Sequence, residues 1–74
     1  MDERLIATVA AALRVPTSTL TLETGPGDLP AWDSLAQINV LSEVETEFGV
    51  SIPIEQVAEI RHIRDFLGYL KKTP

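Results

Sequence analysis

Residues 33–49 have the sequence DSLAQINVLSEVETEFG, which is the clearest secondary-structure signal in the chain. Apolar residues recur in it at three- and four-residue spacing, and a glycine stands where a helix would stop. The pattern predicts a helix that begins at Asp33-Ser34 and ends at Phe48-Gly49. Its buried stripe is expected to contain Ile38, Val40, Leu41, Val44 and Phe48. Its opposite face is expected to contain Leu35, Asn39, Ser42, Glu43 and Thr46, with Glu45 and Glu47 on the borders.

Three further helices are predicted around this one. An amphipathic helix spans Asp2 to Arg14 and stops before Pro16. A short helix follows Pro53, since proline is favoured at a first helical position. The last helix runs from about Ile63 to Lys72, where Lys71 and Lys72 complement its C-terminal dipole. The residues expected to face the core from these helices are Leu5, Ile6, Val9, Ala12, Leu13, Val57, Ile60, Ile63, Phe66, Leu67 and Leu70.

A long connection occupies residues 15–33, because its prolines and glycines forbid a continuous helix. We expect Leu20, Leu22 and Leu29 to tie this loop to the core. Structured loops of such length in small domains are usually functional or disordered. The expected fold class is therefore all-α. It is a small four-helix bundle in one domain over residues 1–74, with three main helices, a short third helix and a long loop between helices 1 and 2.

The composition excludes several kinds of site. The chain has 74 residues, no cysteine and one histidine, His62. It therefore offers no disulfide framework, no thiolate zinc site and no histidine-rich metal site, so we expect no bound metal. We find no signal-peptide pattern and no apolar run long enough to span a membrane. The expectation is a discrete cytoplasmic protein that acts as a monomer.

The negative charge is concentrated in the middle of the chain. The net charge is −5, but residues 15–60 carry eight carboxylates and no lysine or arginine. Such a segment repels phosphate backbones, so we expect no nucleic-acid partner. It would instead steer the protein toward a basic partner surface. The alternative is a solvated acidic surface that only keeps a small protein soluble.

Ser34 has two interpretations. In the structural one, Ser34-Leu35-Ala36-Gln37 is a Ser-x-x-Gln capping box at the start of the helix, or Asp33 is the cap in its place. In the functional one, the hydroxyl lies at a helix N-terminus, where a phosphate is stabilised, and the preceding loop keeps it accessible. Esterification of Ser34 by a phosphate-bearing group would then leave the fold intact.

The order of motifs resembles the acyl carrier protein family. Asp33-Ser34-Leu35 is followed by Glu45, Glu47 and Phe48-Gly49-Val50, and then by Ile52-Pro53. The familiar form is Asp-Ser-Leu, a helix ending in Glu-x-Glu-Phe-Gly, and then Ile-Pro before a short helix. Asp-Ser-Leu alone is a weak signal, but with the downstream spacing it is specific. The resemblance covers nearly the whole chain.

The resemblance implies a carrier without catalytic residues. Ser34 would carry a 4′-phosphopantetheine arm, transferred from coenzyme A by a phosphopantetheinyl transferase. The thiol of the arm would hold an acyl or aminoacyl group as a thioester. This explains the missing cysteine, since the reactive thiol belongs to the cofactor. Partners would include an acyl- or aminoacyl-loading enzyme and a downstream synthase or transferase.

Further residues receive roles from the same resemblance. Asp33 would help the transferase engage, Leu35 would be an apolar contact beside the arm, and Ile38 would border a groove for the tethered chain. Partner enzymes would recognise the predicted second helix through Leu35, Ile38, Asn39, Ser42, Glu43, Glu45 and Glu47.

The sequence departs from the usual pattern in ways that bear on the pathway. Ala36, Asn39 and Thr46 stand where fatty-acid carriers usually have acids, and Trp32 precedes Asp-Ser-Leu. These departures favour specialised metabolism, such as polyketide-like synthesis, over housekeeping fatty-acid synthesis. His62 stands where the last helix usually has a better cap, so that end is expected to be weak.

Two other classes of function remain open at this stage. One is a small acidic helical adapter, in which Ser34 is only an N-cap. The other is a hydrolase built on Ser34 and His62, which only their geometry could support.

Overall fold

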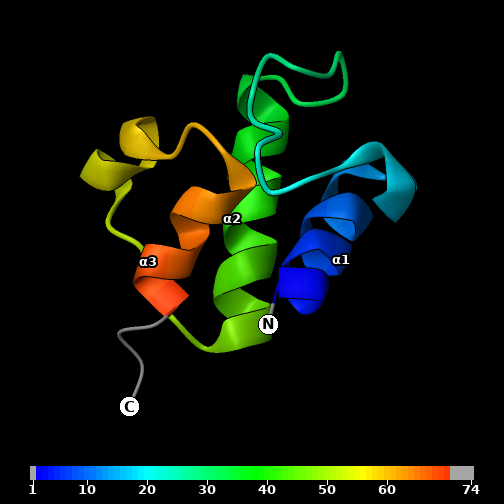
Figure 1. The fold of residues 1–74 in the computed structure, drawn as a ribbon. Coiled ribbons are helices and arrows are strands. Elements are labelled where there is room, and N and C mark those ends of the chain that lie inside the picture. Colours follow the sequence, from blue (N-terminus) through cyan, green and yellow to red (C-terminus); the bar gives the residue numbers. More distant parts are fainter. Residues whose placement is uncertain (1, 71–74) are drawn as a thin grey trace.

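The computed structural model describes residues 2–70, and the regular elements in that range are all helical (Figure 1). The α-helices are α1 (Asp2–Leu13), α2 (Ser34–Phe48) and α3 (Leu67–Leu70). Three 3₁₀ helices accompany them, η1 (Thr17–Thr19), η2 (Ile54–Glu59) and η3 (Ile63–Phe66). The predicted all-α class is confirmed, and the short helix after Pro53 is a 3₁₀ helix.

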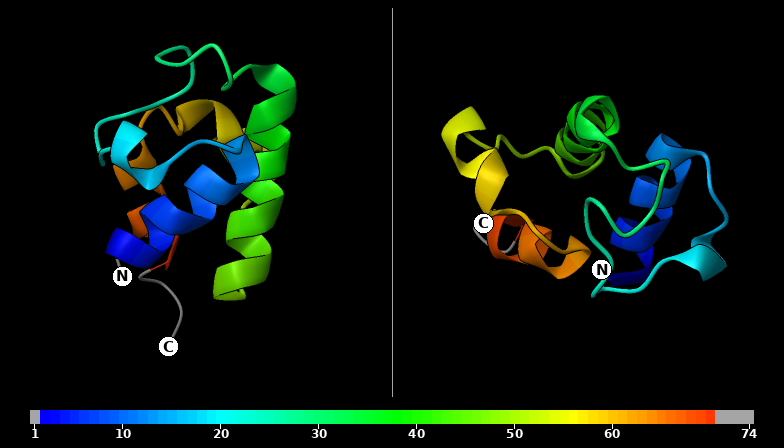
Figure 2. Two further views of the ribbon diagram at one scale, coloured as in Figure 1. Left: turned by 90° about the vertical axis from the view of Figure 1, so that its right-hand side faces the viewer. Right: turned by 90° about the horizontal axis from the view of Figure 1, so that it is seen from above.

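The helices surround one core. Helix α2 packs along α1, and the η3–α3 segment contacts α1 through η3 (Figure 2). The long loop between α1 and α2 passes between these elements in the view from above. The buried apolar side chains come from each of these segments and from the connections on either side of η2: Leu5, Val9, Ala10, Leu13, Leu20, Trp32, Val40, Val44, Ile52, Ile60, Ile63, Phe66 and Leu70.

The core prediction is wrong for one residue of α2. Val40 and Val44 are buried, and Leu41 and Phe48 are half-buried, as the spacing predicts. Ile38, however, exposes 61% of its surface. At 3.6 residues per turn, side chains two positions apart point to nearly opposite sides of a helix. Because Val40 faces the core, Ile38 faces outward.

The last helix is divided in the structure. It starts at Ile63 as predicted, but its first turn is the 3₁₀ helix η3, and α3 continues it to Leu70. Ile63, Phe66 and Leu70 are buried and Leu67 is half-buried, so the predicted inward face is confirmed. The predicted role of Lys71 and Lys72 at the C-terminal end lies outside the described residues.

The long loop is fastened to the start of η3. The Ile63 N–H donates to the Thr24 carbonyl oxygen at 2.8 Å, and the Arg64 N–H donates to the Leu22 carbonyl oxygen at 3.0 Å. Gly25 is buried where a Cβ would overlap the Arg61 carbonyl oxygen, so only glycine permits this approach. Leu20 is buried, which confirms its expected anchoring role. Leu22 and Leu29 are half-buried against the same core.

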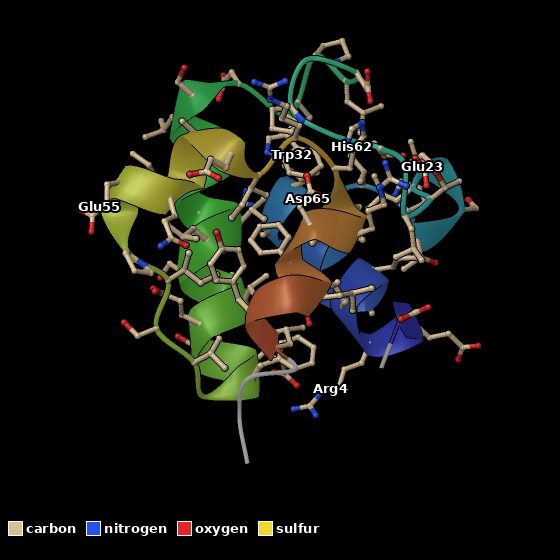
Figure 3. The ribbon with its side chains drawn as sticks, turned by 60° about the vertical axis from the view of Figure 1, so that its left-hand side comes forward. Arg4, Glu23, Trp32, Glu55, His62 and Asp65 are labelled. Atoms are coloured by element: carbon tan, nitrogen blue, oxygen red, sulfur yellow. The ribbon has the colours of Figure 1, made fainter. Side chains whose placement is uncertain are left out.

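Arg4 joins the start of α1 to the end of α2. Its guanidinium donates to Glu47 Oε2 at 3.0 Å and to the Glu47 carbonyl oxygen at 2.8 Å. It also lies 4.7 Å from the centroid of the Phe48 ring. A cation at the C-terminal end of a helix is favourable, because the last carbonyls carry partial negative charge. Figure 3 shows Arg4 at this end of the molecule.

Asp65 caps the N-terminus of η3. Its carboxylate accepts hydrogen bonds from the N–H groups of Arg61 at 2.8 Å and His62 at 3.0 Å, and His62 and Asp65 lie together in Figure 3. That His62 is a poor cap which leaves this end weak stays a prediction, and a carboxylate one turn later supplies an acceptor for this end. Burial raises the pKa of Asp65, but these two hydrogen bonds, together with the charges of His62 and Arg64, outweigh it, so the pKa lies below its ordinary value.

Truncation of the two phenylalanines should have unequal effects. Phe66 is fully buried, so Phe66→Ala should lower the free energy of unfolding by about 3–5 kcal/mol, a large share of the stability of a small domain. Phe48 is half-buried, so Phe48→Ala should cost less, although it also removes the contact with Arg4. Urea unfolding followed by circular dichroism measures both. Equal losses would contradict this assignment of the core.

The cap at Asp65 should make stability depend on pH. Asp65→Ala should cost about 1 kcal/mol at neutral pH, the usual value of a helix cap. Because folding lowers the pKa of Asp65, this stabilisation is fully present above the ordinary value of 3.8. It should be lost as the pH falls through the lower value of the folded state.

Urea unfolding of both proteins across this pH range measures the difference between them. Glu55→Ala is the matched control, because Glu55 is exposed on η2. A difference between wild type and Asp65→Ala that persists unchanged at the acid end would contradict the role of the carboxylate charge.

Candidate functional site

Trp32 fixes the end of the long loop in front of α2. Its side chain is only 2% exposed, and its indole Nε1–H donates to Gln37 Oε1 at 2.6 Å. Its backbone N–H donates to the Leu29 carbonyl oxygen at 3.0 Å. Helical periodicity does not place Trp32 in the core, because the residue lies in the loop before α2. A signal existed, because the residue before a helix cap often packs against the fourth helical residue, which here is Gln37.

Asp33, not Ser34, caps α2. The Asp33 backbone is extended, with φ −95° and ψ −170°, and its side chain accepts from the Ala36 N–H at 2.9 Å. The Asp33 carbonyl oxygen accepts from the Gln37 N–H at 2.9 Å. The predicted capping box from Ser34 to Gln37 is therefore wrong, because the Gln37 side chain is bonded to Trp32. Of the two caps that the sequence left open, the structure has the aspartate.

Because Asp33 caps α2, the Ser34 hydroxyl is not needed as a helix cap. Ser34 is the first residue of α2 and is exposed. Within residues 2–70, no hydrogen bond uses its Oγ. Esterification at this oxygen would consequently break no intramolecular bond among those residues. The site combines an accessible hydroxyl with a backbone held rigidly by the two residues before it.

A groove of about 710 Å³ opens beside Ser34. Its walls are the N-terminal part of α2, the glycine-containing end of the long loop and the segment from η2 to Arg61. The apolar part of the lining includes Ile38, Val57, Ala58 and Ile60, together with Trp32 and Pro26. The groove joins residues more than twenty positions apart in the sequence, so the fold alone brings the serine and this apolar wall together.

The exposed side of α2 next to Ser34 is apolar. Leu35 exposes 70% of its surface and Ile38 61%. Asn39, Ser42 and Glu43 are exposed farther along the helix. Leu35 and these three residues line a second groove, of about 550 Å³, which α2 shares with the end of α1. The structure thus places five of the residues expected to recognise partners on one accessible side of α2.

The two glutamates near the end of α2 have intramolecular partners. Glu45 is half-buried, and its Oε2 accepts from the Ile52 N–H at 2.6 Å, which holds the turn after the helix. Glu47 forms an ion pair with Arg4 at 3.0 Å. These contacts explain both carboxylates without a partner protein.

The structure also bears on a catalytic triad, a metal site and a membrane-spanning helix. His62 does not line the groove of Ser34, and its Nδ1 lies 3.6 Å from Asp65 Oδ2, so a triad of Ser34 and His62 is not assembled. Among residues 2–70, no group of three acidic, histidine or cysteine side chains is placed to hold a metal ion. In the same range, none of the helices has the length and apolar character needed to cross a membrane.

Comparisons with known proteins show which family this chain resembles. The family model described as "Phosphopantetheine attachment site" matches residues 3–70. The chain is 36% identical over 74 residues to the mitochondrial acyl carrier protein of Dictyostelium discoideum, covering all of this chain and 61% of that protein. Thus the chain spans about three fifths of that relative's length.

Two bacterial relatives are similar over nearly their whole length. The acyl carrier protein of Porphyromonas gingivalis is 34% identical over 74 residues, covering 99% of this chain and 94% of the relative. The acyl carrier protein of Treponema pallidum is 37% identical over 75 residues, covering 96% of this chain and 95% of the relative.

The contact between Trp32 and Gln37 should stabilise the site as a pair. Trp32→Phe should lower the free energy of unfolding by about 1–3 kcal/mol, because it leaves the half-buried Gln37 oxygen without its donor. Gln37→Met should lower it too, by leaving the indole N–H unpaired. The double variant should lose less than the sum, by about 0.5 kcal/mol or more. Chemical unfolding of the four proteins completes this cycle, and strict additivity would contradict the pairing.

Proposed function

This chain belongs to the acyl carrier protein family, whose members carry covalent 4′-phosphopantetheine, and we propose that Ser34 is the residue that carries it here. The observation that supports the assignment is the division of work at the start of α2. Asp33 satisfies the helix cap, so the neighbouring serine hydroxyl is exposed and unengaged among the described residues. Residues 1–74 form the carrier domain in this proposal.

Attachment is a phosphoryl transfer onto Ser34 Oγ. A phosphopantetheinyl transferase removes the hydroxyl proton, Oγ forms a bond to the phosphorus of coenzyme A nearest the pantetheine, and adenosine 3′,5′-bisphosphate leaves. A phosphodiester at this position is next to the free N–H groups of the first turn of α2, where negative charge is favoured. Asp33 keeps the helix start in a fixed conformation and presents a carboxylate to the transferase. Once attached, the arm supplies the thiol that holds cargo as a thioester.

The groove beside Ser34 gives the tethered chain an apolar surface. Ile38, Val57, Ala58 and Ile60 contribute to its wall. Burial of apolar surface contributes roughly 25 cal/mol per Å², so even partial insertion of an acyl chain is favourable. In this proposal, Ile38 is an apolar side chain exposed to solvent because it contacts the tethered chain.

The accessible side of α2 is proposed as the surface that partner enzymes recognise. It includes Leu35 and Ile38 beside the attachment point, and the exposed polar residues Asn39, Ser42 and Glu43. Glu45 and Glu47 remain candidates by resemblance, although their intramolecular bonds restrict them. Proposed partners are the transferase, an acyl- or aminoacyl-loading enzyme and a downstream synthase or transferase. The absence of basic residues from 15 to 60 favours partners with basic surfaces.

We place the carrier in specialised metabolism, such as polyketide-like synthesis. Ala36, Asn39 and Thr46 leave α2 less acidic than is usual for fatty-acid carriers. Fewer exposed charges on α2 give weaker electrostatic steering toward partners than the usual acidic helix of fatty-acid carriers would. The adapter alternative assumed that Ser34 is the N-cap, a position that Asp33 occupies.

Intact mass spectrometry tests the attachment site. After incubation with coenzyme A, magnesium and a broad-specificity transferase, wild type should gain the mass of one phosphopantetheine. Ser34→Ala should gain nothing, and its stability should stay within about 0.5 kcal/mol of wild type, because the hydroxyl makes no bond within residues 2–70.

Ser18→Ala is the matched control for this experiment, since Ser18 is an exposed serine in η1, outside the surface of α2 proposed to recognise partners. It should be modified like wild type. Modification of Ser34→Ala would contradict the site, and failure of several transferases to modify wild type would contradict the carrier function.

A further inference from the structure

The four arginines of the described range are used differently. Arg4 pairs with Glu47 at 3.0 Å, and Arg64 pairs with Glu23 at 3.2 Å. The guanidinium groups of Arg14 and Arg61 have no ion pair or hydrogen bond within residues 2–70. An arginine held in a structure but left unpaired is available to bind an anion.

Two contacts of Arg61 and the burial of the residue before it hold the Arg61 backbone in place. Its N–H donates to Asp65 Oδ2 at 2.8 Å. Its carbonyl oxygen lies against Gly25, where no side chain fits. The preceding residue, Ile60, is buried in the core with 3% exposure. The exposed Arg61 side chain therefore starts from a rigid point, which reduces the entropy lost when it binds.

Arg61 and Ser34 line the same groove. Among residues 2–70, the groove lining includes no other lysine or arginine, and it includes the acidic residue Asp33. Arg14 lines the second groove instead, and Ser34 is absent from that lining. An anion attached at Ser34 would thus share its groove with an unfavourable neighbour, Asp33, and with Arg61, the one cation in the described part of the lining.

We propose that Arg61 binds the phosphodiester attached to Ser34 and thereby positions the arm along the groove between α2 and η2. The inference rests on Ser34 as the attachment residue. A guanidinium suits this task, because its planar donors match two phosphate oxygens. It neutralises the single negative charge that the phosphodiester adds beside Asp33, which would otherwise repel it. The arm is then directed over Ile38 and Val57 and away from the second groove.

The expected effect is moderate, because Arg61 is exposed. Exposed ion pairs shift equilibria by up to about fivefold, so loss of the charge should lower the population of the arm in the groove by roughly two- to fivefold. The difference should shrink at high salt, since screening acts on such pairs.

NMR of the modified proteins tests the contact. Wild type, Arg61→Gln, Arg61→Lys and the control Arg64→Gln are each converted to the phosphopantetheine form, and the conversion is verified by intact mass. The first readout is the ³¹P chemical shift of the phosphodiester. The second is the change in the methyl signals of Ile38 and Val57 between the unmodified and modified proteins.

Arg61→Gln should move the ³¹P signal and reduce the methyl changes. Arg61→Lys should restore them in part, since it retains the charge, and Arg64→Gln should leave both readouts at their wild-type values. A purely structural role for Arg61 would not produce this recovery. Thermal unfolding of the unmodified variants confirms that the fold is intact in each.

Two results would overturn the contact while the carrier function stands. One is a full mass increase in every variant with identical ³¹P and methyl signals. The other is a response of these signals to Arg61 only when the arm carries a dicarboxylic cargo and not when it carries an acetyl group, which would assign Arg61 to the cargo. Absence of the mass increase in wild type would overturn the carrier function, and this inference with it.

Discussion

The hydrogen bond from the Ala36 N–H to the Asp33 carboxylate is the contact on which the site depends. It satisfies the start of α2 with a residue outside the helix, so the first helical residue, Ser34, needs no bond of its own. Trp32 reinforces this contact, because its buried ring and its bond to Gln37 hold the chain that enters the helix. The consequence is a Ser34 hydroxyl that makes no hydrogen bond among residues 2–70 and stands on a backbone held by its neighbours.

The long loop contributes by closure rather than by regular structure. Its carbonyl groups at Leu22 and Thr24 accept from the first N–H groups of η3, and Gly25 allows the two segments to touch. This contact brings Arg61 and Ile60 to the groove that begins at Ser34. The site is therefore formed by the loop, α2 and the segment from η2 to Arg61 together, and no single element contains it. This arrangement supports the proposed position of the arm.

Helix positions and most of the core follow from local patterns, and the family follows from the Asp-Ser-Leu and Phe-Gly…Ile-Pro order. The orientation of Ile38 does not follow from the three- and four-residue spacing, because its neighbours at 35 and 41 suggest different faces. A capping box at Ser34 would need the side chain of Gln37. Gln37 is bonded to the indole of Trp32 instead, and Trp32 is held there by its burial in the core, which local sequence does not reveal. The grouping of Arg61 with Ser34 depends on tertiary packing, which local periodicity does not describe.

The most direct test is a high-resolution crystal structure of the protein after treatment with coenzyme A and a transferase. The account predicts a phosphate group on Ser34 Oγ, with the Asp33 carboxylate still within hydrogen-bond distance of the Ala36 N–H. A structure in which Ser34 Oγ is unmodified and itself accepts from the amides of the first turn of α2 would contradict it.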